Sequence, residues 1–459
     1  MNTKSPWGLL SLLLIGTFMG TLGNSMVSIA LSALKDHFSV SLTLAVWSIT
    51  LYTLTFSVLM PIFSILGPAI GIKRLYLGGM SLVCAGSLLS VLAPNFGIFI
   101  FARILTGVGV GTFLPSIMWV ITNKFHPDFQ GRATGYWALV NSLGHAIGPT
   151  LSGFLLQYLD WRAIFYLNIP FGLLCIFLSI KVFPVDKRMP LKRFDTAGAT
   201  ATAAFTFSLM LAITLAIKKG VDSYQTIILL ATTTISLLFL ILYERRQSIP
   251  FVDLSLFKNK KYLASISAIS TQAFSQFGLL VSLPLFLIEG NGMNQQTAGL
   301  LVMIMTMMMA LISPISGKLS DEWGSKTVCW AGILFLAIGA ASFLIFHVET
   351  ITGMNIILFA AGLLIFGIGF GFIQSASTVS VIHSVPAEKA GAATGFFHMI
   401  RFVNASLGST VFGIILENNQ KGLIGGYYLG FIIILVLSIC ALPVMFWMAE
   451  RIRSSAVSV

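Results

Sequence analysis

Apolar segments of about 20 residues recur along almost the whole chain, and this repetition restricts the possible folds more than any other feature. As a helix, a segment of this length spans the hydrocarbon core of a bilayer, since each residue adds about 1.5 Å. The segments lie at residues 7–34, 44–66, 75–93, 97–122, 132–158, 163–183, 196–217, 224–243, 262–288, 296–316, 327–347, 353–380, 391–416 and 425–449. The sequence therefore predicts an all-α polytopic membrane protein with fourteen transmembrane helices.

The composition excludes other classes of protein. Of the 459 residues, 56% are hydrophobic and 9% are charged, which is too much apolar surface for a soluble domain to bury. The net charge of +12 would suggest a nucleic-acid partner in a soluble protein, but here the basic residues lie at helix ends and no such partner is predicted. The four cysteines lie in apolar runs without a CxxC pair, which argues against a disulfide framework or a zinc site. No metal or other cofactor is expected.

The basic residues predict the orientation of the chain. If the first residue lies in the cytoplasm, 20 of the 27 Lys and Arg residues fall near inner helix ends and five near outer ends, while Arg103 and Arg401 lie within the membrane. This asymmetry predicts a multi-pass protein of the cell membrane with both termini in the cytoplasm. The apolar run that starts near Trp7 is too long for a signal-peptide core, so we expect it to be a retained first helix.

An internal repeat predicts how the helices are grouped. A shift of 260 residues superposes glycines of the first half on glycines of the second half. The superposed pairs are Gly107 and Gly367, Gly109 and Gly369, Gly111 and Gly371, Gly131 and Gly391, Gly135 and Gly395, Gly148 and Gly408, and Gly153 and Gly413. Such a duplication predicts two six-helix bundles, at 1–183 and 262–459. Residues 184–261 between them hold two extra transmembrane helices, with basic cytoplasmic loops at 184–195 and 244–261.

A glycine-rich helix and the corner after it resemble a known family. Gly144, Gly148, Pro149 and Gly153 place small residues on one helix face, where a neighbouring backbone can approach closely and the helix can bend. They resemble the antiporter motif in the fifth helix of drug exporters of the major facilitator superfamily. Residues 161–170, WRAIFYLNIP, resemble the WR-x-x-F-x-x-N-x-P signature of its fourteen-helix drug:proton antiporter branch. The resemblance implies the major facilitator fold, secondary transport of a small amphipathic substrate coupled to the proton gradient, no enzyme activity and a monomer.

Two buried basic side chains are candidates for proton coupling. Residues 103–109, RILTGVG, resemble the family's RxxxGxG motif, whose arginine is implicated in proton coupling. The alternative is that Arg103 snorkels or caps nearby carbonyl groups. His145 lies between the glycines of the antiporter motif and can titrate near neutral pH. It is the second candidate, and the alternative is a simple hydrogen bond to a neighbour.

A loop in the second half resembles the superfamily's cytoplasmic gate. Residues 317–326, GKLSDEWGSK, resemble GxLaDrxGrk, a motif that here comprises Gly317, Asp321, Gly324 and Lys326. The resemblance implies that Asp321 and the basic residues form an ion-pair latch at the helix ends. The first-half copy at 64–74 has Pro68 where the acidic residue is expected. The latch is therefore expected in the second half and is in doubt in the first.

The acidic residues are informative because none lies deep in a predicted helix. The family's first helix usually reads lDxTxxNxALP, but Gly23 stands here at the position of the aspartate. A buried cationic substrate would have no carboxylate to neutralise it. With Arg103 and Arg401 inside the membrane, we expect the cavity to favour neutral, zwitterionic or anionic amphiphiles.

Polar and aromatic residues near the predicted midplane are candidates for the substrate cavity. Each of them is alternatively a hydrogen-bonding residue between packed helices. The candidates are Asn24, Tyr52, Trp137, Asn141, Gln272, Gln276, Gln374, His398, Arg401 and Asn404.

The sequence leaves three functions open. The motifs favour proton-coupled export of amphipathic drugs or antimicrobials by alternating access. The missing carboxylate leaves open a facilitator or importer of a neutral or anionic metabolite, such as a vitamin, without proton antiport. A membrane-embedded transferase is a remote alternative, because it would need clustered acids or a nucleophile–base pair near the interface, and the sequence offers none.

Overall fold

The computed structural model describes residues 5–183, 194–247, 250–345, 354–418 and 422–448. Most of the expected basic loop at 184–195 and both chain ends lie outside the described residues. Within the described ranges the chain forms fourteen long α-helices and no strand. The helices are α1 (Pro6–Phe38), α2 (Leu42–Ile70), α3 (Ile72–Leu92), α4 (Phe96–Lys124), α5 (Pro127–Tyr158), α6 (Ala163–Val182), α7 (Thr196–Lys219), α8 (Tyr224–Glu244), α9 (Lys260–Leu285), α10 (Gln295–Trp323), α11 (Ser325–Ile345), α12 (Met354–Ser384), α13 (Ala387–Asn418) and α14 (Gly422–Ala441). Three short helical turns, η1 (Leu256–Lys258), η2 (Phe286–Gly290) and η3 (Leu442–Trp447), complete the described part.

Helix α5 differs from the others in its polarity. Thirteen helices in the described part of the chain are long and apolar enough to cross a membrane, and α5 is not among them. Its 32 residues exceed the length needed, but glycines and polar residues such as Asn141 and His145 interrupt its apolar character. Because α5 packs along both α1 and α10, two of its faces meet protein and not lipid. The least apolar helix is therefore one that joins the two halves of the molecule.

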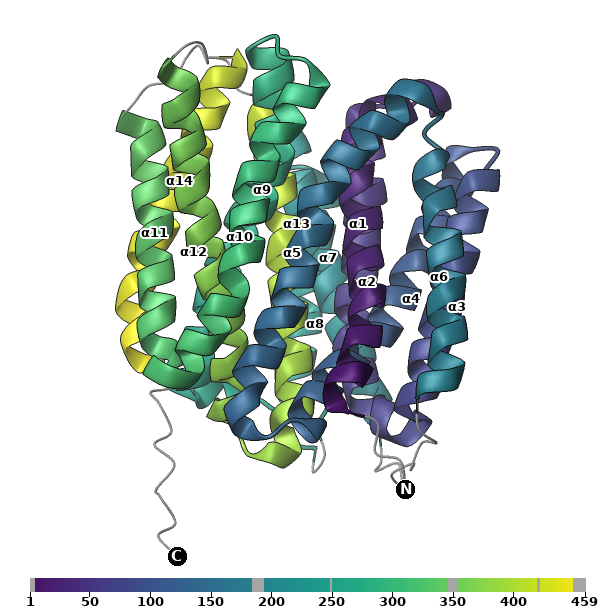
Figure 1. Cartoon of the computed structure of the whole chain (residues 1–459), viewed down its shortest axis with the longest axis vertical. Coiled ribbons are helices and arrows are strands. Elements are labelled where there is room, and N and C mark those ends of the chain that lie inside the picture. The colour runs from purple at the N-terminus through teal and green to yellow at the C-terminus, as the bar shows by residue number, and fades with distance from the viewer. Residues whose placement is uncertain (1–4, 184–193, 248–249, 346–353, 419–421, 449–459) are drawn as a thin grey trace, which may run out of the picture.

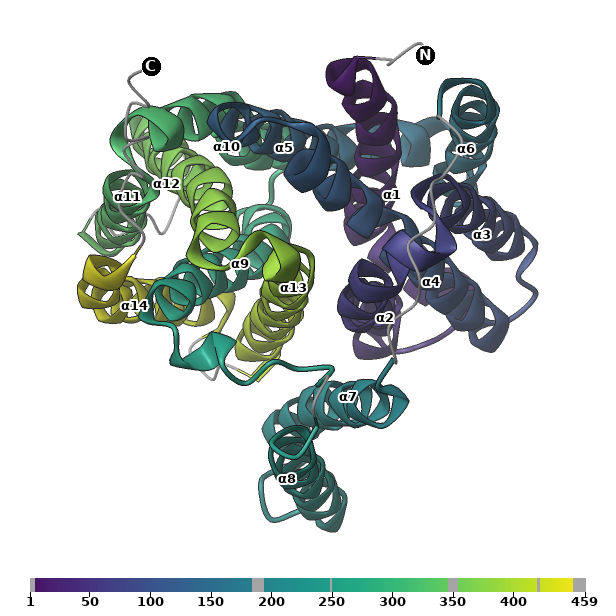
Figure 2. The same ribbon diagram turned by 90° about the horizontal axis from the view of Figure 1, so that it is seen from below.

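The helices form two bundles with a pair of helices beside them. Helices α1–α6 make one bundle and α9–α14 the other (Figure 1). Seen from below, α7 and α8 lie outside both bundles: α7 is next to α2 and α13, and α8 packs on α7 farther out (Figure 2). The second bundle has a core of its own, built from residues between Ala264 and Met448. The cores of the first bundle come from residues between Leu9 and Phe183, joined by Phe402 of α13. The two bundles thus fold around separate cores and meet along α5 with α10 and α2 with α13.

Glycines related by the repeat make similar packing contacts in each bundle. A side chain added at Gly109 of α4 would place its Cβ atom 2.6 Å from the carbonyl oxygen of Gly79 in α3. At Gly369 of α12 the Cβ atom would lie 2.9 Å from the carbonyl oxygen of Gly332 in α11. Such distances exclude any side chain, so these helix pairs approach closely only because glycine is present. The same packing in both bundles is what a duplicated unit would produce.

One glycine of the gate motif is required by the backbone in both halves. Gly71 separates α2 from α3 with φ of 102°, and Gly324 separates α10 from α11 with φ of 89°. Residues with a Cβ atom rarely adopt these values, whereas glycine adopts them at little cost. The tight reversal explains why the first-half loop keeps this glycine although it lacks the acidic residue.

Polar contacts join the extra helices to each other and anchor the loop after them to the second bundle. Asp195 caps α7 by accepting a hydrogen bond of 2.8 Å from the Gly198 amide, and the Tyr243 hydroxyl of α8 donates to the same carboxylate at 3.2 Å. After α8, Asp253 pairs with Lys389 at the start of α13 at 2.6 Å. The loop between α8 and α9 is therefore anchored to the end of α13.

The Asp253–Lys389 pair should make stability depend on pH. Burial raises the pKa of Asp253, but hydrogen bonds from Lys389 and Ser255 outweigh it, so the net pKa lies below its usual value. A carboxyl group of this kind stabilises the fold above its unfolded pKa of about 4, and the contribution is lost as the pH falls through the lower folded pKa. Lys389→Met should therefore cost about 0.2–1 kcal/mol at pH 7 and almost nothing in strong acid.

Thermal unfolding in detergent at neutral and acidic pH measures this effect. Lys318→Met is a control, because Lys318 lies 3.7 Å from Glu322 in a more exposed pair on one helix. An equal loss for Lys389→Met at both pH values would contradict the assignment.

Candidate functional site

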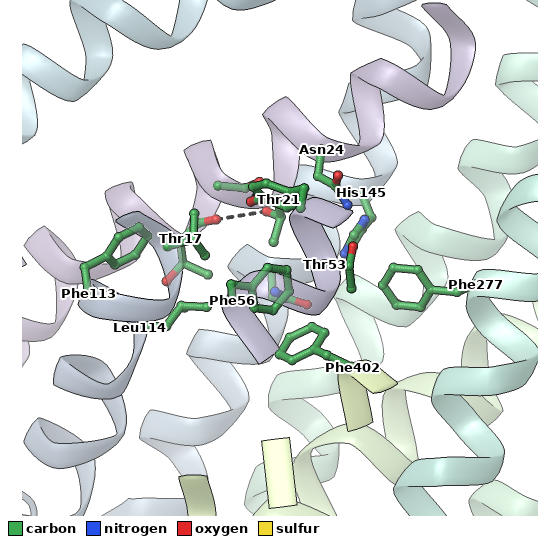
Figure 3. Close-up of a pocket in the computed structure, with 14 residues that line it drawn as sticks. Thr17, Thr21, Asn24, Thr53, Phe56, Phe113, Leu114, His145, Phe277 and Phe402 are labelled. Carbon is green, nitrogen blue, oxygen red and sulfur yellow. Dashed lines mark hydrogen bonds between the residues drawn. The ribbon is translucent and has the colours of Figure 1, made fainter. Parts of the chain in front are cut away.

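A pocket lies between the two bundles. Fourteen residues line it, coming from α1, α2, α4 and α5 of the first bundle and from α9 and α13 of the second. Figure 3 shows Phe277 and Phe402 approaching it from the second bundle, opposite Thr21 and Asn24 of α1. The pocket is narrow in this conformation, because the ring centres of Phe56 and Phe402, which line it from opposite bundles, are 4.5 Å apart. A sizeable ligand would require the bundles to move relative to each other.

Arg103 is buried beside this pocket and is held by neutral groups. Its Nη2 donates to Oδ1 of Asn24 at 3.0 Å, and its Nε donates to the carbonyl oxygen of Ser48 at 3.2 Å. The guanidinium carbon lies 4.4 Å from the centre of the Tyr52 ring, and the Tyr52 hydroxyl donates to the carbonyl oxygen of Gly20 at 3.0 Å. Arg103 therefore connects α4 to α1 and α2 through one charge-assisted network.

No acidic residue lines the pocket, in keeping with the missing aspartate of α1. The space beside Gly23 is occupied by Asn168 of α6, whose Nδ2 would lie 2.8 Å from a Cβ atom at position 23. A neutral amide thus stands where the family pattern would direct a carboxylate. Within the part of the chain that the structure describes, no group of three or more His, Cys, Asp or Glu side chains is placed to hold a metal ion.

The glycine face of α5 packs against α1. A Cβ atom at Gly144 would collide with Thr21, and one at Gly148 would collide with the Ser25 hydroxyl. The Ser25 hydroxyl also donates to the carbonyl oxygen of Gly144 at 2.9 Å. The close approach of backbones predicted from the sequence is therefore present at these two glycines.

Gly153 does not share this contact. A Cβ atom there would have no protein atom within 4 Å, so the third glycine of the motif lies beyond the crossing of α5 with α1. Pro149 lies inside α5, where its ring removes one backbone donor and permits a bend. The two helices cross at Gly144 and Gly148, and the rest of the motif extends past the crossing.

The predicted cavity residues divide into two groups. Asn24, Tyr52 and Asn141 line the pocket, as does His145, which was predicted for proton coupling. The others are distributed around it: Trp137, Gln272, Gln276, Gln374, His398 and Arg401 are buried close to the bundle interface or inside the second bundle, and Asn404 bonds within that bundle.

Several of the buried amides pair with one another. Gln374 Nε2 donates to Asn141 Oδ1 across the bundles at 3.4 Å, and Gln272 Nε2 donates to Gln276 Oε1 within α9 at 2.6 Å. Asn404 donates to the Ser270 hydroxyl at 3.2 Å, and this hydrogen bond joins α13 to α9. For Asn404, the structure thus favours the helix-packing interpretation.

A second buried arginine lies in very different surroundings from the first. Arg401 is 1% exposed, and none of its three guanidinium nitrogens has a hydrogen-bond partner among the described residues. Its guanidinium carbon lies 5.7 Å from the Trp137 ring and 5.1 Å from the Phe402 ring. Trp137 in turn contacts His398 edge to face at 5.2 Å. This group brings together three predicted cavity residues from α5 and α13.

The gate motif of the second half contacts the start of α5. The Asp321 carboxylate lies against Gly131 so closely that any side chain at position 131 would collide with it. Gly317 similarly faces the carbonyl oxygen of Gly131. Gly391 of α13 is the second-half counterpart of Gly131, and it has nothing within 4 Å of its Cβ position. The contacts of Gly131 and Gly391 therefore differ between the two halves, in keeping with Pro68 at the acidic position of the first-half loop. Lys326, the basic residue of the motif, faces Phe446, with 5.8 Å between its Nζ and the ring centre.

The structure also identifies pocket residues that were not predicted. Thr17 and Thr21 line the pocket together with Asn24, and their spacing of four and three residues places all three on one face of α1. This polar stripe in an apolar helix was a usable signal in the sequence. Phe277 and Phe402 had no such signal, because phenylalanine is common throughout the apolar segments.

Comparison with known proteins places the chain in a family. Residues 13–409 match the family model described as Major Facilitator Superfamily. The chain is 30% identical over 426 residues to the riboflavin transporter RibZ of Clostridioides difficile, covering 91% of each protein. It is also 30% identical over 403 residues to the multidrug resistance protein Stp of Mycobacterium tuberculosis, covering 88% of this chain and 74% of that protein.

A solved structure supports the fold independently. The human organic anion transporter MFSD10 (TETRAN) matches with a TM-score of 0.69 at 14% identity, covering 96% of this chain and all of that chain. At this identity the similarity concerns the fold alone. The membrane-embedded transferase is excluded, since the family and the relatives named above are transporters and not enzymes. The protein therefore belongs to the Major Facilitator Superfamily.

Proposed function

We propose that the protein is a secondary transporter of the cell membrane that moves small amphipathic organic molecules by alternating access. The observation that carries this proposal is the pocket between the bundles, where aromatic rings from both halves meet neutral polar groups of the first half. Sites at the interface of two repeats, at mid-depth in the membrane, suit a mechanism in which one bundle rocks against the other. The close crossing of α1 and α5 at Gly144 and Gly148 supports such a motion. Glycine has no side chain that would interdigitate with the neighbouring helix and hinder its movement.

Proton-coupled export of drugs or antimicrobials is the first candidate for the direction of transport. The glycine motif of α5 and the similarity to a protein named for multidrug resistance support it. Uptake or facilitated passage of a neutral or anionic metabolite is the second candidate. It is favoured by a pocket lining without acidic residues and by the similarity to a protein named as a riboflavin transporter.

The conformation is consistent with a pocket closed toward the cytoplasm. With both termini inside, the cytoplasmic ends of α2 and α13 meet where Gly395 packs against Pro61 and Ser64. Asp321 and Gly131 close the other side of the interface between α10 and α5. We propose that these two contacts open and close during transport and that a single chain carries out the cycle.

Transport assays in proteoliposomes with a pH-sensitive dye inside test the proposed function. A pH gradient is imposed, and ethidium, riboflavin and fluorescein are added as cationic, neutral and anionic probes. Proton flux evoked by a probe would support antiport, and probe movement without proton flux would support the facilitator. Movement of none of the probes, beyond that in protein-free liposomes, would contradict transport of amphipathic molecules.

His145 allows proton coupling to be tested directly. It lines the pocket, its ring lies 5.3 Å from the Phe277 ring, and its Nδ1 has no hydrogen-bond partner among the described residues. If His145 carries the proton, His145→Gln should remove the dependence of the transport rate on pH between about 5 and 8, because glutamine does not titrate. Initial rates across this range provide the measurement.

A histidine on the same helix serves as the control. His126 is exposed at the start of α5, and His126→Gln should keep the native pH profile. A native profile in His145→Gln would show that His145 does not carry the proton.

A further inference from the structure

The two arginines buried between the helices differ in how their charge is compensated. Arg103 donates to Asn24 and to the carbonyl oxygen of Ser48, and it stacks on Tyr52. Arg401 is equally buried, but Nε, Nη1 and Nη2 all lack a hydrogen-bond partner among the described residues. A guanidinium group has five N–H donors and stays protonated in proteins. Arg401 therefore presents an unused, positively charged donor set inside the molecule.

The neighbours of Arg401 leave this charge uncompensated. The Trp137 and Phe402 rings offer a cation–π attraction at 5.7 and 5.1 Å, but rings at this distance do not accept the five N–H groups. The Trp137 Nε1 atom and both ring nitrogens of His398 also lack partners within the described part of the chain. Buried charges are normally paired, and buried donors are normally hydrogen-bonded. Three neighbouring side chains that break this rule together indicate a site that is completed by a ligand.

This group is continuous with the pocket. Phe402 follows Arg401 on α13 and lines the pocket, and Trp137 lies one helical turn from Asn141, which also lines it. The donors of Arg401 and Trp137 thus lie at the edge of a space whose walls include Phe56, Phe277 and Phe402 (Figure 3).

We propose that Arg401, Trp137 and His398 form the subsite that binds the oxygen-rich, acceptor end of the substrate, a carboxylate or ring carbonyl, while its aromatic body lies among the phenylalanines of the pocket. This subsite rests on the proposed transport function and specifies its substrate class. It selects aromatic compounds that carry an anionic or carbonyl group, and it repels cations through the charge of Arg401. The missing carboxylate on α1 belongs to the same selectivity, because an acid near the pocket would neutralise this charge.

The stability of the substrate-free protein tests whether Arg401 has a structural role. Arg401→Met removes an unpaired cation and keeps an apolar side chain of similar length, so the thermal midpoint should stay the same or rise. Arg103→Met is the matched variant, because it breaks a satisfied network and leaves Asn24 without its donor, so the midpoint should fall. An equal fall for both variants would overturn the proposal, since Arg401 would then be held by partners within the protein.

Binding to purified protein in detergent tests the subsite itself. Fluorescence anisotropy measures the affinity for fluorescein as the anionic probe, riboflavin as the neutral probe with ring carbonyl groups, and ethidium as the cationic probe. We expect fluorescein affinity to fall at least tenfold in Arg401→Met, riboflavin affinity to fall less, and ethidium affinity to stay the same or rise. Unchanged fluorescein affinity in this variant would overturn the proposal.

The two measurements separate the failure of the subsite from that of the proposed function. If the native protein binds none of the three probes, the function as a transporter of aromatic amphiphiles fails. The thermal midpoints still decide whether Arg401 is an uncompensated cation, because they require no ligand. If the native protein binds the probes and Arg401→Met binds them equally well, the function stands and the subsite is wrong.

Discussion

An Arg103→Ala protein should insert into the membrane and transport at least about tenfold more slowly than the native protein. The substitution removes hydrogen bonds to Asn24 and to the Ser48 carbonyl group and the stacking on Tyr52. Hydrogen bonds to a charged group contribute about 1.5–3 kcal/mol net, and each 1.4 kcal/mol is a factor of ten in an equilibrium. Because this network joins α4 to α1 and α2 beside the pocket, its loss should disturb the conformations that transport requires.

The measurement is the initial transport rate in proteoliposomes, normalised to the amount of inserted protein. Arg103→Lys is the control that retains the positive charge. An ammonium group cannot reproduce the planar arrangement of the guanidinium, so we expect a rate between those of the native protein and Arg103→Ala. A native rate in Arg103→Ala would show that Arg103 serves neither coupling nor the geometry of the pocket.

Gly148→Leu should abolish transport by separating α5 from α1. Even the Cβ atom of the new side chain would collide with the Ser25 hydroxyl, and it would lie 3.3 Å from the carbonyl oxygen of Leu22. Overpacking a well-packed interior costs about 1–3 kcal/mol, and here the obstacle includes backbone that cannot rotate away. The substitution should lower the thermal midpoint and stop the rocking of the bundles.

Gly153→Leu is the matched control, since it places the same side chain on the same helix where no atom lies within 4 Å of the Cβ position. It should transport at nearly the native rate. Transport rates and thermal midpoints of both variants provide the comparison. A native rate in Gly148→Leu would mean that the crossing with α1 is not needed in the transport cycle, and equal losses in both variants would point to a general intolerance of leucine in α5.

The positions of the helices were largely predictable, and the contacts of individual side chains were not. The apolar segments predicted the positions of the helices because a bilayer requires about 20 apolar residues, although α5 proved less apolar than the other thirteen long helices in the described part of the chain. The close approach of a neighbouring helix was correctly expected at Gly144 and Gly148, which contact α1. The same pattern included Gly153, whose Cβ position has no atom of another helix within 4 Å. A helical pattern specifies which face carries small residues, and only the crossing angle of two helices decides how far along that face the contact extends.

The candidate site shows the same division. The absence of a carboxylate from the middle of the predicted helices could be seen in the sequence, and no acidic residue lines the pocket. Asn404 had the same polarity as Asn24, yet it bonds within the second bundle while Asn24 binds Arg103. Phe277 and Phe402 could not be identified from the sequence as pocket residues, because only their position opposite the first bundle distinguishes them from the many other phenylalanines.

The sequence by itself determined that the protein is polytopic, duplicated and a member of the Major Facilitator Superfamily, since these properties depend on segment length, composition and motifs. The tertiary structure alone decided which of two equivalent buried arginines is satisfied. Arg103 finds Asn24, 79 positions away along the chain, whereas Arg401 faces rings and donors. Polarity along a helix shows that a side chain needs a partner, but the partner is supplied by another helix, and its identity is fixed only when the helices pack.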